Sequence, residues 1–189
     1  DKKAWFGQDD RSYIQHLYTD DVTCGRVVKK DVDMPTTFYV NATPPSESDF
    51  SGLSVANACN SINEMIGRIK ERYGEYLNWK NIRIEVANGV YNETVNIMGF
   101  MGSGQITIDL SSSVKVYGKW RMQDNTIAVV ITGNRSALDS NNGAELILTD
   151  EGYNALFYVK NCYCRITNLR SLNKCYPKSD GTKYGNSFI

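Results

Sequence analysis

The chain has 189 residues, of which 41% are hydrophobic and 22% are charged, and both values are ordinary for a soluble globular domain. Lysine and arginine number 21, as do aspartate and glutamate, so the net charge is zero, which argues against a nucleic-acid-binding protein. No apolar run approaches the roughly 20 residues that a membrane-spanning helix needs, so we expect no membrane insertion. The length suits one domain, or one domain with a tail.

Residues 1–36 differ from the rest of the chain, because they mix aromatic residues with acidic pairs and show no sustained periodicity. We expect an N-terminal arm, closed by Pro35, that attaches the protein to something else. Aromatic side chains anchor many protein interfaces. The candidate partner-binding residues of the arm are therefore Trp5, Phe6, Tyr13 and Tyr18. A tail that packs on its own domain is the alternative.

The second part of the chain, residues 37–189, begins with TFYVNAT, whose β-branched and aromatic residues predict a strand over 37–43. A loop rich in proline and serine follows. A helix is then predicted from Val55 to about Tyr73, with Ser54 as its N-cap and Gly74 at its end. Its apolar residues recur at steps of three and four and form one stripe, so we expect the helix to cover the open end of a β core.

After Trp79 the pattern changes to short apolar runs separated by glycine and asparagine. The predicted strands are 82–86, 94–97, 105–108, 114–117, 127–132, 145–149, 155–159 and 164–169. Many short strands predict an all-β sandwich, barrel or β-helix. The brevity of the runs and the asparagines near their ends favour a parallel β-helix, with coils from about residue 82 and the helix 55–73 as its terminal cap.

The five cysteines fit no zinc-binding spacing, and we interpret them as small buried side chains of a reduced protein. No phosphate-binding loop, dinucleotide motif or HExxH sequence is present. The sequence therefore predicts neither a metal site nor a cofactor.

The stretch IRIEVANGVYNETVNI, residues 82–97, contains Asn88-Gly89, a pair typical of a hairpin turn. The helix before it and the runs after it favour a corner of a coil instead. As a functional motif, Gly-x-Tyr-x-Glu would place Tyr91 against a sugar and use Glu93 as an acid. We prefer a structural interpretation, in which a turn glycine precedes an aromatic packed over the helix and a carboxylate that bonds nearby amides.

The segment FYVNAT…SGLS…SINEMI, followed by IRIEVANGVYNETVNIMGFMGSGQITI, resembles the start of a right-handed parallel β-helix of the pectin-lyase-like superfamily. It is most similar to β-helix domains of phage and prophage tail proteins. The resemblance implies a virion location and a tailspike, tail-fibre or baseplate-appendage subunit, as a homotrimer. Residues 1–36 would bind other tail or baseplate proteins, and the β-helix, cut short at the C-terminus, would be a shaft that helps to recognise a host-surface polysaccharide.

Two alternatives remain: a polysaccharide-degrading lyase, hydrolase or esterase, and a bacterial surface adhesin, which would be extracellular or at the cell surface. The resemblance carries over no esterase site, because QDNT at 123–126 is only a partial match to one catalytic motif. It carries over no calcium-binding aspartate cluster either. The remaining candidate catalytic carboxylates are Asp109 and Glu145, which would form a pair if one lay a coil above the other.

A candidate carbohydrate-binding patch consists of Tyr117, Trp120 and Arg121, since an exposed tryptophan beside a tyrosine can stack against a sugar ring. A place in the core or in a subunit contact is the preferred interpretation of Trp120.

Overall fold

The computed structural model describes residues 36–77, 79–148 and 155–173. The predicted N-terminal arm lies outside these residues, and with it the partner-binding candidates Trp5, Phe6, Tyr13 and Tyr18. The described part of the chain is all-β, with ten strands in two parallel sheets and two helices. Neither helix of this part is long and apolar enough to span a membrane.

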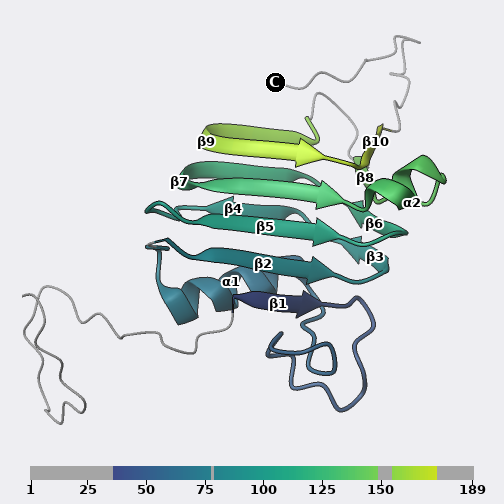
Figure 1. Ribbon diagram of the computed structural model, residues 1–189, viewed down its shortest axis with the longest axis horizontal. Helices are drawn as coiled ribbons and strands as arrows, with labels where there is room; N and C mark the ends of the chain where they lie inside the picture. The colour runs from purple at the N-terminus through teal and green to yellow at the C-terminus, as the bar shows by residue number, and fades with distance from the viewer. Residues whose placement is uncertain (1–35, 78, 149–154, 174–189) are drawn as a thin grey trace, which may run out of the picture. The chain divides into compact units, whose positions relative to one another are not determined.

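Along the chain the strands pass repeatedly between the two sheets, with β1 and β2, and again β4 and β5, following one another in the six-stranded sheet (Figure 1). Their bounds are β1 (Thr37–Val40), α1 (Ile62–Tyr73), β2 (Asn81–Val86), β3 (Gly89–Asn92), β4 (Val95–Met98), β5 (Gln105–Leu110), β6 (Val114–Tyr117), β7 (Trp120–Gly133), α2 (Arg135–Asp139), β8 (Glu145–Leu148), β9 (Phe157–Thr167) and β10 (Arg170–Asn173). The six-stranded sheet has the order β1-β2-β5-β7-β4, with β9 also beside β7, and the four-stranded sheet has the order β10-β8-β6-β3.

Strand β7 belongs to two ladders. Its residues 120–123 pair with β4, and its residues 128–133 pair with β5. Strand β9 pairs with both parts of β7, with a register shift between Asn125 and Ala128. The two runs predicted at 155–159 and 164–169 are therefore parts of one strand that turns a corner. Strands β2 and β3 lie in different sheets, so Asn88-Gly89 is a corner and not a hairpin turn.

The core is built by inward-facing side chains that stack in register from strand to strand. Phe38, Ile84, Ile108 and Ile131 occupy the same position on β1, β2, β5 and β7, and each is at most 1% exposed. Because side chains alternate along a strand, a slip of one residue would move each apolar set to the solvent face. Burial on the inner face therefore fixes the register of the whole stack.

At one corner, a residue in the left-handed backbone conformation (positive φ) recurs at the same place in successive levels of the stack. Met98, Gln123 and Lys160 are aligned in the ladders, and the next residues are Gly99, Asp124 and Asn161. Their φ values are 72°, 52° and 48°. Glycine, asparagine and aspartate are the residues that tolerate this conformation best. The Asn161 side-chain amide donates to Asp124 Oδ1 at 2.9 Å, which links two levels of the corner.

The residue after this corner in β7, Asn125, turns inward and is only 3% exposed. Its Nδ2 donates to the carbonyl of Ile97 at 2.7 Å, and its Oδ1 accepts from the amide of Phe100 at 2.9 Å. A buried backbone group without a partner is costly. Asn125 thus satisfies the two backbone groups that the corner between β4 and β5 leaves open.

Helix α1 is held to the sheets at its N-terminus by Glu93, which follows β3. Ser61 Oγ donates to this carboxylate at 2.8 Å, and the amides of Ile62 and Asn63 donate to it at 2.9 Å each. The first amides of a helix have no partner within the helix, and a negative charge there also interacts favourably with the helix dipole. Glu93 is therefore the amide-bonding carboxylate that the structural interpretation predicts.

Gly89 and Tyr91 also have structural roles, although Tyr91 does not rely on the helix for its hydrogen bonds. Gly89 has a φ of 156°, and an added Cβ would lie 2.8 Å from the Cβ of Ala42. The Tyr91 hydroxyl accepts from the amide of Ala42 at 3.0 Å and donates to the carbonyl of Ala87 at 2.8 Å. Burial raises the pKa of Tyr91 to about 12, so it remains a neutral donor at physiological pH.

The helix begins later than its predicted start at Val55. Its N-cap is Ser61, whose side chain accepts from the amide of Glu64, whereas Ser54 caps only a turn at Asn57. The preceding segment pairs with the edge of β1, since the amide of Cys59 donates to the carbonyl of Tyr39 at 2.9 Å. Backbone groups that are used by this edge are not free to form a helix. The apolar stripe that remains in α1 is buried, as predicted, in the same core as the strands, by Ile62, Met65, Ile66 and Ile69.

We predict that Glu93→Ala lowers the free energy of unfolding by about 2–3 kcal/mol, because two helix amides and one hydroxyl lose a charged acceptor. Urea denaturation followed by circular dichroism measures the change. Glu71→Ala, on the exposed face of α1, is the matched control and is expected to change stability by less than about 0.5 kcal/mol. Equal losses in the two variants would contradict the capping role of Glu93.

We predict that Asn125→Leu lowers stability by about 2–4 kcal/mol, since the Ile97 carbonyl and the Phe100 amide would both lose their partner in the core. Asn161→Gly is the comparison, because glycine accepts the left-handed corner and the Asn161 side chain is exposed to solvent there. Its expected change is less than about 1 kcal/mol. Thermal unfolding of both variants is the measurement. If Asn125→Leu lost less stability than Asn161→Gly, the Asn125 side chain would not have the proposed role of bonding to the Ile97 carbonyl and the Phe100 amide.

Candidate functional site

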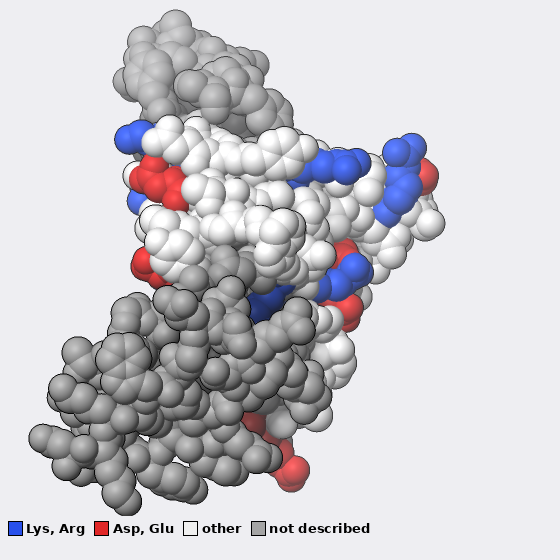
Figure 2. Space-filling model, turned by 60° about the vertical axis from the view of Figure 1, so that its left-hand side comes forward, with Lys and Arg blue, Asp and Glu red and all other residues white. Residues whose placement is uncertain are grey.

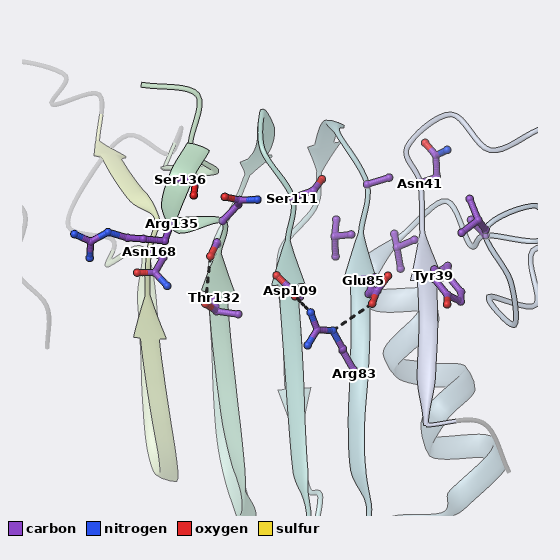
Figure 3. Close-up of a pocket in the computed structure, with 17 residues that line it drawn as sticks. Tyr39, Asn41, Arg83, Glu85, Asp109, Ser111, Thr132, Arg135, Ser136 and Asn168 are labelled. Atoms are coloured by element: carbon purple, nitrogen blue, oxygen red, sulfur yellow. Dashed lines mark hydrogen bonds and ion pairs between the residues drawn. The ribbon is translucent and has the colours of Figure 1, made fainter. Parts of the chain in front are cut away.

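A groove of about 690 Å³ lies on the outer face of the six-stranded sheet, near the carboxyl ends of β1, β2, β5 and β7 (Figure 3). This volume is within the range of small-molecule sites in proteins. One wall is the loop after β1, which contributes Val55 and Ala58. The other wall is the start of α2, from Asn134 to Ser136.

The floor of the groove is a row of outward-facing side chains in register. Tyr39, Glu85, Asp109 and Thr132 occupy one position on β1, β2, β5 and β7, as Figure 3 shows. Each stands one residue before an inward-facing position, so the register that builds the core also builds this row. Three strand spacings give the row a length of about 14 Å across the strands.

Arg83 holds the two carboxylates of the row together. Its Nε lies 3.3 Å from Glu85 Oε1, and its Nη2 also pairs with Asp109 Oδ2. Like charges on adjacent strands repel each other, and one guanidinium between them offsets this repulsion. The Asp109 side chain is 24% exposed and that of Glu85 is 46% exposed, so both carboxylates remain accessible from the groove.

Neutral polar groups surround this ionic centre. Ser111 Oγ donates to Asn88 Oδ1 at 2.8 Å, and Thr167 Oγ1 donates to Thr132 Oγ1 at 3.1 Å. At the α2 wall, Arg135 is paired with Asp139 at 3.2 Å. The groove therefore combines hydroxyls with charges that already have partners, an arrangement suited to binding a polar ligand by hydrogen bonds.

The predicted catalytic pair Asp109 and Glu145 is wrong as a pair, because the two residues lie in different sheets. Glu145 is in β8, in register with Lys115, and its carboxylate lies 3.5 Å from the Lys115 ammonium. Asp109 has Glu85 beside it instead. This neighbour was missed, although IRIEV and ITIDL place their acidic residues identically relative to the apolar ones, and an alignment of the two runs would have found it.

The predicted carbohydrate-binding patch is wrong for Trp120, which is fully buried in the core. Alternation along β7 turns Trp120 and Met122 inward and leaves Arg121 exposed. Tyr117, at the end of β6, lies half-buried in the other sheet. The core interpretation of Trp120 is confirmed, and without an exposed indole ring the three residues do not form a sugar-stacking surface.

A second surface is apolar and flanks the left-handed corner, where Met98 is 45% exposed and Tyr163 is 69% exposed. Figure 2 turns this side toward the viewer and shows charged side chains mainly at its margins. This apolar surface could contact another molecule, but among the described residues it lacks a set of polar side chains that point toward one place. The groove has such a set, and it is therefore the candidate site.

The cysteines in the described ranges are unsuited to nucleophilic chemistry. Burial raises the pKa of Cys164 to about 11 and also raises the pKa of Cys59 and Cys162. These thiols remain protonated at neutral pH. Cys59 is buried, as predicted, whereas Cys162 and Cys164 are only half-buried. Within the same ranges, no three His, Cys, Asp or Glu side chains gather closely enough to hold a metal ion.

Comparisons of the chain with protein-family models, with curated proteins and with solved structures found no match. What the groove does must therefore be inferred from its own residues.

We predict that Trp120→Phe changes the free energy of unfolding by less than about 1.5 kcal/mol, because the buried Trp120 Nε1 has no hydrogen-bond partner in the described part of the chain to lose. Trp120→Ala removes the whole ring and is expected to cost about 3–5 kcal/mol. Urea denaturation of both variants is the measurement. A loss of more than 3 kcal/mol in the phenylalanine variant would indicate that the indole N–H has a stabilising partner.

Proposed function

We propose that residues 37–173 belong to a right-handed parallel β-helix of the pectin-lyase-like type, and that the chain is a structural and attachment component of a phage tail. In this proposal the protein is a homotrimer in a tailspike, tail fibre or baseplate appendage. The β-helix is a shaft that contributes to host-surface recognition, and residues 1–36 attach it to other tail or baseplate proteins.

The observation that carries this proposal is the in-register return of the chain. The strands β2, β3 and β4 pair in the same order with β5, β6 and the first part of β7. A chain that passes through three strands and returns one strand spacing further along the stack is what a β-helix requires. In Figure 1 the path through β2, β3, β4 and β5 rises in the right-handed sense, which is also the usual sense of parallel crossovers.

The two ends of the stack differ in a way that supports an extended shaft. Helix α1 contacts β1 and β4 at the β1 end. At the other end, Cys164 and Ile166 of β9 are only half-buried, whereas their ladder partners Val129 and Ile131 in β7 are fully buried. A further coil or a neighbouring subunit at this end would complete their burial.

A polysaccharide-degrading function has one observation in its favour, the neighbouring carboxylates Glu85 and Asp109. Adjacent strands are about 4.8 Å apart, which is near the separation of the two carboxyl groups in retaining glycosidases. However, Arg83 contacts both carboxylates and occupies the space between them, where the glycosidic bond would have to lie. The binding role is therefore the better-supported function.

The proposal predicts that antibodies against residues 37–173 label the tails of phage particles in immunogold electron microscopy. Particles built with a chain that lacks residues 1–36 are expected to lose the label, because attachment is assigned to that segment. Label on the bacterial envelope instead of on particles would overturn the proposal and support an adhesin. Release of new reducing ends or of unsaturated sugars from host polysaccharide by the purified chain would overturn the non-enzymatic role.

A further inference from the structure

The groove on β1, β2, β5 and β7 presents strong hydrogen-bond acceptors at its centre. The carboxylates of Glu85 and Asp109 are held in place by Arg83 and remain partly exposed. An ionised carboxylate accepts short, strong hydrogen bonds from hydroxyl groups. Because the two carboxylates come from adjacent strands in register, they offer acceptors to two neighbouring hydroxyls of one ligand.

Hydroxyl groups continue on both sides of the carboxylates. Thr132 extends the row beyond Asp109, and Ser111 lies at the carboxyl end of β5 (Figure 3). A serine or threonine hydroxyl both donates and accepts, so it can bond to another hydroxyl in either direction. The polar part of the groove thus matches a ligand with many hydroxyl groups along its length.

Apolar contacts are also available to such a ligand. The side chain of Val55 is 67% exposed at the loop wall, and Tyr39 stands at the β1 end of the row. Small-molecule sites combine apolar and aromatic walls with a few placed polar groups, and this groove has both. A sugar ring presents a similar combination, with C–H groups on its faces and hydroxyls at its rim.

The charges of the groove select against an acidic ligand. Among the residues that the structure describes, four charged ones line it, Arg83, Glu85, Asp109 and Arg135. Arg83 is shared by two carboxylates, and Arg135 is paired with Asp139. An anionic ligand would face two carboxylates, and both arginines of the groove are already engaged. A neutral ligand meets no such electrostatic repulsion from Glu85 and Asp109.

We propose that this groove binds a neutral saccharide segment through Glu85, Asp109, Thr132 and Ser111, and excludes chains that carry carboxylates. The inference rests on the proposed function for the source of the saccharide, a host-surface polysaccharide. The row of about 14 Å runs across the strands, so the bound segment lies along the direction in which the strands stack.

The test is a glycan array that carries neutral, N-acetylated and uronate-containing oligosaccharides, probed with the full-length chain. Binding to uncharged oligosaccharides and not to uronates is expected. Binding to uronates alone, or to no oligosaccharide at millimolar concentration, would overturn the proposal. The array measures binding without regard to where the protein is located. The saccharide proposal can therefore be refuted while the phage-tail assignment stands, and the phage-tail assignment can be refuted while the saccharide proposal stands.

Two matched variants then locate the binding. Asp109→Asn keeps the shape of the side chain but loses the charged acceptor, and we expect about tenfold weaker binding of the best neutral oligosaccharide in titration calorimetry. Glu145→Gln makes the same kind of change in a carboxylate of the four-stranded sheet that is paired with Lys115, and it is expected to leave affinity unchanged. Circular dichroism confirms that both variants are folded. If Asp109→Asn and the unsubstituted chain had equal affinities, the saccharide would bind elsewhere, and the groove would not be the binding site.

Discussion

The parallel strands of this protein stack in register, and both its core and its groove follow from that register. Each inward position must repeat on the next strand, as Ile84, Ile108 and Ile131 do, because any slip would expose apolar side chains and bury polar ones. The same register also fixes which side chains are neighbours on the outer face, even where those side chains carry like charges. It places Glu85 directly beside Asp109, and Arg83 offsets the resulting repulsion.

The corners of the stack show how backbone groups that leave the ladders find new partners. Asn125 bonds to a carbonyl and to an amide at one corner, and Glu93 accepts from the first amides of α1 at another. Both are polar residues close to the core, positions that usually attract functional interpretations. Here their hydrogen bonds are used within the fold. The groove differs, because its two carboxylates are partly exposed and, within the described ranges, are paired with Arg83 alone.

Several elements were predictable because they depend on local pattern. The runs IRIEV and VKVY alternate strongly and form β2 and β6, and the apolar stripe of α1 is evident from its spacing. The start of α1 was mispredicted because the segment before it pairs with the edge of β1, a contact between residues far apart in sequence. Strand β7 begins at Trp120, earlier than the apolar run suggests, because its first part is stabilised by β4 and β9.

Residue spacing and nearby residues were enough to predict the all-β class, most of the strands, the amphipathic helix and the structural role of Glu93. The pairing of side chains on neighbouring strands, in contrast, is visible only in the folded protein. Asp109 has Glu85 as its neighbour and not Glu145, and Trp120 faces the core and not the solvent. Strand register and sheet membership depend on burial across the whole stack, which no single run encodes. A short run predicts which of its own side chains face inward, but it does not predict which strand will pair beside it.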